Sequence, residues 1–191
     1  MEPGDEWDVD GLLAKVRGGQ PDAFAGVIGK YQRRIHRFCY WMLGDRLEAE
    51  DALQEIFFKA YLHLESYRYD GSFGTWLYAI ASNHCRSLLR RKQRWRLLMP
   101  LLGGRSEEKS AEAVYSGSAE SQLELLQGLS AKEKEILILR VFEDRSFEDI
   151  GRLLGSSAAA ARKRFERVRA KVKEQRIREG EKGYGHRYEL Q

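Results

Sequence analysis

Apolar residues recur at intervals of three and four along almost the whole of this 191-residue sequence. Such intervals place side chains on one face of an α-helix, whereas a half-buried strand requires strict alternation, which is scarce here. One long stripe begins after Pro21-Asp22 and stops before Gly44-Asp45, and both pairs are typical of helix boundaries. Its members are Phe24, Val27, Ile28, Tyr31, Ile35, Phe38 and Met42. The spacing therefore predicts an all-α protein.

Two further helices are predicted before residue 96. The first runs from about Glu48 to Leu64, and an Asp70-Gly71 turn follows it. Its predicted buried face consists of Leu53, Ile56, Phe57, Ala60 and Leu64. The second continues into a basic segment, and its predicted buried stripe consists of Phe73, Trp76, Leu77, Ile80, Ala81 and Leu88.

The helical pattern fades between about residues 97 and 121, in a segment with Pro100, a Gly-Gly pair and many Ser, Glu and Ala residues. This composition is typical of a flexible linker. Beyond it, Ser130 and Glu133 have the spacing of a capping box, which predicts a helix through Val141 or Phe142.

Two more helices are predicted after this one. A short helix follows Ser146 and ends at Gly155, and Ser157 opens the last helix, so the pair predicts a helix-turn-helix. We therefore expect two small helical domains at 1–96 and 122–176, a linker at 97–121, and a charged, disordered tail at 177–191.

Composition argues against several classes of protein. Cys39 and Cys85 lie in apolar stretches, which favours reduced thiols in a cytoplasm over a disulfide framework, and two isolated thiols make a poor metal site. Residues 1–10 are acidic, and no later run approaches the roughly 20 apolar residues that span a bilayer. We expect a cytoplasmic protein with no membrane insertion, metal or cofactor.

The exposed face of the predicted helix at 48–64 mixes acids with large apolar side chains. A rotation of about 100° per residue places Asp51, Glu55, Phe58 and Leu62 opposite the core, with Glu48 beside them. A solvated face would be polar throughout, so the mixture favours a protein-docking surface. The alternative is that Phe58 and Leu62 pack beneath a loop of their own domain. A catalytic or metal role is disfavoured, because no histidine or third carboxylate converges on the two acids.

Two strongly basic segments favour nucleic-acid binding. Residues 83–96 hold six Arg or Lys residues and no acid, and follow Tyr67, Arg68, Tyr69, Phe73 and Trp76. Aromatic rings stack on unpaired bases and guanidinium groups neutralise phosphates, so this segment suits a single strand. The alternative is that Phe73 and Trp76 are core residues and the arginines a solvated face.

The last helix carries the second basic segment. Residues 157–173 hold seven basic residues against the single acid Glu166, and the face opposite the core presents Ala160, Lys163, Arg164, Arg167 and Lys171. The second helix of a helix-turn-helix, with small residues at its start and cations on its exposed side, can enter a DNA major groove. A coiled coil or a solvated cationic face is the alternative.

Three motifs, in this order, resemble those of the extracytoplasmic-function (ECF, group 4) sigma factors of the sigma-70 family. Ala49-Glu-Asp-Ala-Leu-Gln-Glu-Ile-Phe57 is similar to the motif that binds the polymerase clamp. Phe73-Gly-Thr-Trp-Leu-Tyr-Ala-Ile-Ala-Ser-Asn83 is similar to the second-region helix that addresses the −10 promoter element. The segments 129–137 and 146–151 resemble the fourth region, whose second helix reads the −35 element.

The resemblance implies a non-enzymatic initiation factor that binds core RNA polymerase and promoter DNA, with an anti-sigma factor as a further partner. It assigns Asp51, Gln54 and Glu55 to the clamp coiled coil of the largest subunit, and the mixed face described above adds Glu48 and Phe58 to this set. It places a second set against the single-stranded −10 element: Tyr67, Arg68, Phe73, Trp76, Asn83, Arg86, Arg90 and Arg91. It places Ala160, Lys163, Arg164 and Arg167 in or beside the groove of the double-stranded −35 element, with Arg162 and Arg169 as candidate phosphate partners.

Two positions depart from the family pattern. The Ala158–Ala161 run stands where members often have Gly-Thr-Val, so the usual hydroxyl is missing at Ala160, and Ser87 stands where an acid is common.

Two other classes of protein are alternatives to a sigma factor. A stand-alone helix-turn-helix regulator would bind double-stranded sites alone, usually as a dimer. A small nuclease or nucleotidyl-transfer protein is disfavoured, because the sequence has no carboxylate cluster or P-loop pattern.

Overall fold

The structure is a computed structural model that describes residues 4–68, 72–99 and 123–185. Every element in these ranges is helical, which confirms the all-α prediction. The chain divides into two compact units, Met1–Glu120 and Ser121–Gln191, and this confirms the expectation of two small helical domains. Residues 100–121 of the predicted linker lie outside the described ranges.

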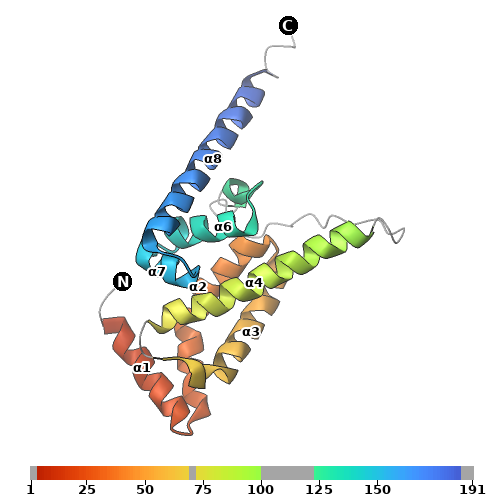
Figure 1. Ribbon diagram of the computed structural model, residues 1–191. Helices are drawn as coiled ribbons and strands as arrows, with labels where there is room; N and C mark the ends of the chain where they lie inside the picture. The colour runs from red at the N-terminus through yellow and green to blue at the C-terminus, as the bar shows by residue number, and fades with distance from the viewer. Residues whose placement is uncertain (1–3, 69–71, 100–122, 186–191) are drawn as a thin grey trace. The chain divides into compact units, whose positions relative to one another are not determined.

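Unit 1 is a bundle in which α1, α3 and α4 all pack on α2 (Figure 1). Its elements are α1 (Gly4–Arg17), η1 (Pro21–Ala23), α2 (Phe24–Leu43), α3 (Arg46–Leu62), η2 (Leu64–Ser66) and α4 (Phe73–Leu98). Sequence periodicity did not predict α1, which inserts Val9 and Leu13 into the core.

The helix boundaries of unit 1 follow from local chemistry. Gly44 ends α2 in the left-handed conformation (φ 74°), which glycine adopts without steric cost. Asp45 then caps α3, because its carboxylate accepts a hydrogen bond of 2.9 Å from the amide of Glu48. Ser72 caps α4 in the same way, through the amide of Thr75.

The core of unit 1 follows the predicted stripe on α2 but differs on α4. On α2, Val27, Ile35, Phe38 and Met42 are fully buried. On α4, the predicted members Trp76, Ile80 and Leu88 are only half-buried. The residues that α4 buries are Phe73, Gly74, Leu77, Tyr78, Ala81, Ser82 and Cys85. The helix contacts both α2 and α3, so it buries a wider and rotated face.

The two cysteines lie in this core as free thiols. Cys39 on α2 and Cys85 on α4 are both fully buried, and their sulfur atoms are 3.8 Å apart. The contact between the two thiols, together with burial, raises the pKa of Cys39. A raised thiol pKa keeps the reactive thiolate scarce.

Unit 2 has the predicted helix-turn-helix. Its elements are α6 (Ala131–Leu137), the π-helical turn η4 (Ile138–Phe142), α7 (Phe147–Leu153) and α8 (Ala158–Gly185), and both α6 and α7 pack on α8. The predicted capping box is present: the Glu133 carboxylate accepts from the Ser130 amide at 2.8 Å, and the Ser130 hydroxyl accepts from the Glu133 amide at 3.4 Å. Ser146 caps α7, and Gly155 follows that helix with a φ of 61°.

Two features of unit 2 differ from the sequence expectation. The helix after Ser130 continues to Phe142 as predicted, but its last five residues form the π-helical turn η4, which leaves Val141 exposed. Helix α8 continues to Gly185, so residues 177–185 are helical where we expected a disordered tail. Arg, Glu and Lys make up four of these nine residues and are good helix formers, whereas three others are glycine. Residues 186–191 lie outside the described ranges.

Close approach of the backbone at Gly151 yields a stability prediction. A Cβ atom there would lie 2.8 Å from the carbonyl oxygen of Ser156 and 3.0 Å from the amide nitrogen of Ala158. We expect Gly151→Ala to lower the free energy of unfolding by about 1 to 3 kcal/mol, since main-chain atoms must move apart. Chemical denaturation followed by circular dichroism measures it.

Gly29, in the interior of α2, provides the control, because a Cβ atom there meets nothing within 4 Å. Gly29→Ala should leave stability unchanged or raise it by up to about 1 kcal/mol through helix propensity. Equal stability of Gly151→Ala and the unmodified chain would contradict the close approach.

Candidate functional site

The outer face of α3 combines exposed apolar side chains with carboxylates. Leu47, Phe58 and Leu62 are 72%, 58% and 57% exposed. Phe58 and Leu62 therefore do not pack beneath any described loop of their own domain, which was the alternative to a docking surface. Asp51, Gln54 and Glu55 are exposed, and Glu48 is half-buried. We name this surface the α3 docking face; it consists of Leu47, Glu48, Asp51, Gln54, Glu55, Phe58 and Leu62.

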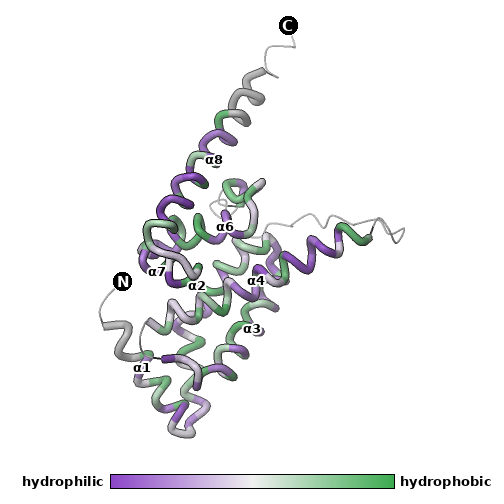
Figure 2. Tube along the Cα trace, viewed as in Figure 1, coloured by the Kyte–Doolittle hydropathy of each residue, from purple (hydrophilic) through white to green (hydrophobic). Residues whose placement is uncertain are grey.

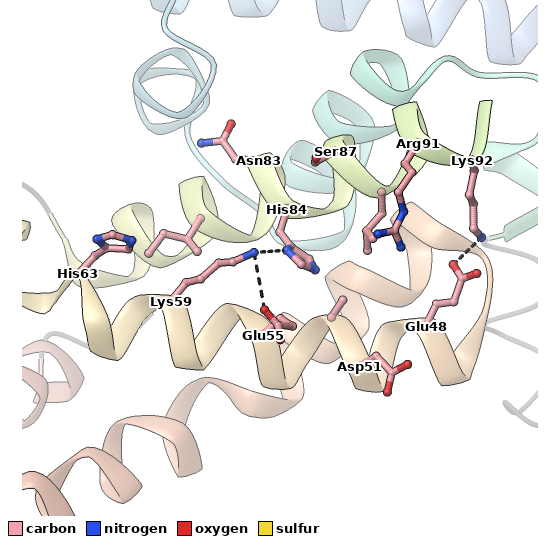
Figure 3. Close-up of a pocket in the computed structure, with 13 residues that line it drawn as sticks. Glu48, Asp51, Glu55, Lys59, His63, Asn83, His84, Ser87, Arg91 and Lys92 are labelled. Atoms are coloured by element: carbon pink, nitrogen blue, oxygen red, sulfur yellow. Dashed lines mark hydrogen bonds and ion pairs between the residues drawn. The ribbon is translucent and has the colours of Figure 1, made fainter. Parts of the chain in front are cut away.

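A groove of about 800 Å³ separates α3 from α4 (Figure 3). Its α3 wall carries three acids, Glu48, Asp51 and Glu55, and one cation, Lys59. Its α4 wall is polar and basic, with Asn83, His84, Ser87, Arg91 and Lys92. Opposite charges therefore face each other across the groove.

Ion pairs within the groove neutralise part of this charge. Lys92 forms an ion pair with Glu48 across the groove. The Lys59 ammonium lies 2.7 Å from Nδ1 of His84 and 3.9 Å from Glu55. Asp51 forms no hydrogen bond or ion pair with any described residue, so its carboxylate is the most available to a partner.

His84 accepts a hydrogen bond from Lys59, because its imidazole is held neutral. Burial lowers the pKa of His84 most, and the positive charge of Lys59 lowers it further, against a weaker opposing effect of Glu55. A neutral imidazole can accept a hydrogen bond from an ammonium, which an imidazolium cannot.

The predicted basic surface of α4 is present on its second half, which Figure 2 shows as largely hydrophilic. Arg90 and Arg91 are exposed. Arg86 donates a hydrogen bond of 2.6 Å to the side-chain oxygen of Asn83, so these two side chains form one polar unit. Their amide and guanidinium groups can together bind a nucleotide.

The aromatic residues before and within α4 form a cluster with one accessible member. Tyr67 and Phe73 are buried, at 5% and 2% exposure, whereas Trp76 is half-buried. The ring centroid of Tyr67 lies 5.3 Å from the ring centroid of Phe73 and 5.4 Å from that of Trp76. Of the two residues in the core alternative, Phe73 is a core residue and Trp76 is only half-buried, and Tyr67 is buried as well. Arg68 is exposed, and Tyr69 lies outside the described residues.

Helix α8 presents cations on two faces. Lys163, Arg164 and Arg167 are exposed and form no hydrogen bond or ion pair with any described residue, and half-buried Ala160 lies among them. We call these four residues the α8 basic face. On the other side, the Arg162 guanidinium lies 4.8 Å from the centroid of Phe147, and Arg169 pairs with Glu166 at 3.5 Å.

Lys171 does not belong to the α8 basic face, although the sequence places it there. Its ammonium donates to both carboxylate oxygens of Glu133, at 3.0 and 3.2 Å, and so joins α8 to the start of α6. The hydrogen bond from the Ser130 amide lowers the pKa of Glu133 most, and Lys171 lowers it further. Sequence alone gives no signal for this pairing, because the residues lie in different helices.

The described residues contain no group of three or more His, Cys, Asp or Glu side chains that could hold a metal ion. Among the described helices, none has both the length and the apolar character to cross a bilayer.

Comparisons with known proteins match both units. The family model of Sigma-70 region 2 matches residues 27–95, and that of Sigma-70, region 4 matches residues 121–172. The ECF RNA polymerase sigma factor SigW of Bacillus subtilis is 30% identical over 85% of this chain and 94% of its own length. The RNA polymerase sigma-H factor of Pseudomonas aeruginosa is also 30% identical, over 84% of this chain and 90% of its own.

Two solved structures share the fold. The structure of CnrH in complex with the cytosolic domain of CnrY has a TM-score of 0.66 and 21% identity, and covers 86% of this chain and 94% of that one. The sigma factor RpoE in complex with the anti-sigma factor NepR, from Bartonella quintana, has a TM-score of 0.65 and 24% identity, and covers 79% of this chain and 94% of that one.

The Glu133 contacts predict a pH dependence of stability. A carboxyl group whose pKa is lower in the folded state stabilises that state above its unfolded pKa, and the effect is lost as the pH falls through the folded pKa. At neutral pH, Glu133→Gln should therefore be less stable than the unmodified chain, by about 0.5 kcal/mol for a partly exposed pair.

Chemical denaturation from neutral pH to about pH 3 should show this difference closing as the pH falls, because both side chains are then uncharged. A difference that stays constant over the whole range would mean that the charge of Glu133 contributes nothing.

Proposed function

The chain belongs to the extracytoplasmic-function sigma factors of the sigma-70 family, and from this premise we propose that its α3 docking face binds the clamp coiled coil in the largest subunit of core RNA polymerase. As an RNA polymerase sigma factor, it directs the core enzyme to promoters. One observation carries the proposal: Phe58 and Leu62 stay more than half exposed among carboxylates. Apolar residues that remain exposed beside charges are typical of protein interfaces.

Charge supports the same assignment and singles out one residue. Glu48 and Glu55 have cationic neighbours in Lys92 and Lys59, whereas Asp51 is exposed and has no described partner. A partner helix that brings a cation to this face would gain most at Asp51, because no internal ion pair has to break.

We propose that α4 binds the displaced strand of the −10 element. Trp76 is the aromatic side chain that can stack on a base, supported from behind by buried Tyr67 and Phe73. The Asn83–Arg86 unit, Arg68, Arg90 and Arg91 supply hydrogen bonds and cations for the same strand. Opening of the duplex then draws on binding energy for the unpaired strand, as base-flipping proteins do.

We propose that the α8 basic face enters the major groove of the −35 element. Lys163, Arg164 and Arg167 are available for base edges, and the small side chain of Ala160 lets the helix approach closely. Arg162 and Arg169 lie on the other side of α8 and are candidates for phosphate contacts.

The remaining proposals concern the chain as a whole. We propose domain limits at 1–96 and 122–176, membership of group 4, action in the cytoplasm beside the polymerase, and no catalytic activity of its own. The RpoE structure contains the anti-sigma factor NepR, which supports the proposal of an anti-sigma partner for this chain. A stand-alone helix-turn-helix regulator is disfavoured, because the region 2 match spans residues 27–95.

Charge reversal at Asp51 tests the polymerase assignment. We expect Asp51→Arg to weaken binding to purified core polymerase about a hundredfold, since a cation would face a surface that binds an acid. Fluorescence anisotropy of labelled protein titrated with core enzyme measures it. Asp22→Arg, an exposed charge reversal in η1, is the control and should bind normally. Unchanged affinity of a folded Asp51→Arg variant would remove the assignment.

Truncation at Arg167 tests the DNA assignment of α8. We expect Arg167→Ala to weaken holoenzyme binding to the upstream promoter element by about 1 to 3 kcal/mol if it contacts a base. If it contacts a phosphate, the loss should be the same for all sequences. Arg176→Ala, on the same helix but outside the α8 basic face, should have little effect. Wild-type binding by Arg167→Ala would contradict the recognition-helix role.

A further inference from the structure

The last residue of α1 reaches the turn that connects α3 to α4. One terminal nitrogen (Nη2) of Arg17 donates hydrogen bonds to the carbonyl oxygens of Leu64, at 2.7 Å, and Tyr67, at 2.6 Å. The guanidinium carbon also lies 5.9 Å from the centroid of the Tyr67 ring. Figure 1 shows α1 beside this turn. A single cation therefore holds both the backbone and the ring of Tyr67.

The position of Arg17 is itself fixed by the end of α1. The amides of Gly18 and Gln20 donate to the carbonyls of Ala14 and Lys15, at 2.9 and 3.0 Å, and close the helix. One and two turns earlier, Leu13 and Val9 are buried in the core. The guanidinium thus projects from the end of a helix that is anchored in the core of unit 1.

Tyr67, which Arg17 contacts, adjoins the proposed −10 surface. Tyr67 directly follows η2 and precedes exposed Arg68. Its ring packs against Phe73 and Trp76 in the first turn of α4. Tyr67 is therefore the one residue that lies between Arg17 and the accessible ring of Trp76.

We propose that Arg17 is a positioning residue for binding of the −10 strand: it fixes Tyr67, and through Tyr67 it sets the placement of Trp76 and Arg68. The inference rests on the proposed function of α4. A site that recognises a base must hold its groups within about half an ångström, which requires support from outside the site. Charge-assisted hydrogen bonds to two carbonyls supply that support here.

The loss of these donors should be local. Tyr67 and Phe73 are buried by apolar contacts that do not involve the guanidinium donors, so the bundle persists when the donors are removed. Arg17→Met keeps the apolar stem and removes both hydrogen bonds. Arg17→Lys restores a cation whose one nitrogen can donate to both carbonyls. Lys15→Met, an exposed cation on the same helix, is the matched control.

The test uses each full-length variant bound to core polymerase. The probe is a fluorescent single strand with the −10 sequence that the wild-type holoenzyme selects from a randomised promoter library. We expect Arg17→Met to bind this strand about tenfold more weakly, as the loss of hydrogen bonds to a charged group implies. Affinity for core polymerase and for a double-stranded −35 fragment should stay at the wild-type level. Arg17→Lys should recover most of the loss, and Lys15→Met should behave as wild type.

Two outcomes would overturn the positioning role while leaving the proposed function intact. In one, Arg17→Met binds the single strand as tightly as wild type. In the other, its affinities for core, −35 duplex and single strand fall together with its unfolding temperature, which indicates general destabilisation. If the wild-type holoenzyme itself fails to bind the single strand, the proposed function of α4 fails, and the inference falls with it.

Discussion

Burial of one face of α2 is the constraint on which unit 1 depends. Helices α1, α3 and α4 all pack on it, and its residues Val27, Ile35, Phe38 and Met42 are closed to solvent. Because α1, α3 and α4 bury their inner faces against α2, their outer faces need not contribute to stability. The α3 docking face and the basic half of α4 can therefore carry charges and exposed apolar groups that a self-sufficient domain would bury or omit.

The two outer faces of unit 1 have opposite charge and lie next to each other. The Glu48–Lys92 ion pair and the Lys59–His84 hydrogen bond lie between them, in the groove. An acidic helix repels phosphates, and a basic helix repels a cationic partner. Each surface would therefore disfavour the ligand proposed for the other, while the pairs in the groove neutralise part of the charge between them.

Local signals predicted much of this fold, and long-range contacts account for the rest. Gly44, Asp45 and the Ser130–Glu133 capping box act within four residues, so the sequence reveals them. The cationic runs of α4 and α8 are visible for the same reason. In contrast, α1 carries only a short apolar stripe, from Val9 to Val16, and is stabilised by contact with α2. Tyr67 is buried by Phe73 and Trp76 from another element. Arg17 was missed because its acceptors are backbone carbonyls far along the chain.

The carboxylate of Glu133 serves two helices at once, as the acceptor for the Ser130 amide at the start of α6 and for the Lys171 ammonium on α8. A rotation of α8 about its long axis would move Lys171 away from Glu133, and it would strain the hydrogen bond between Glu133 and the Ser130 amide. The orientation of the cationic side chains on α8 thus depends in part on Glu133, an acid on a different helix and outside the α8 basic face.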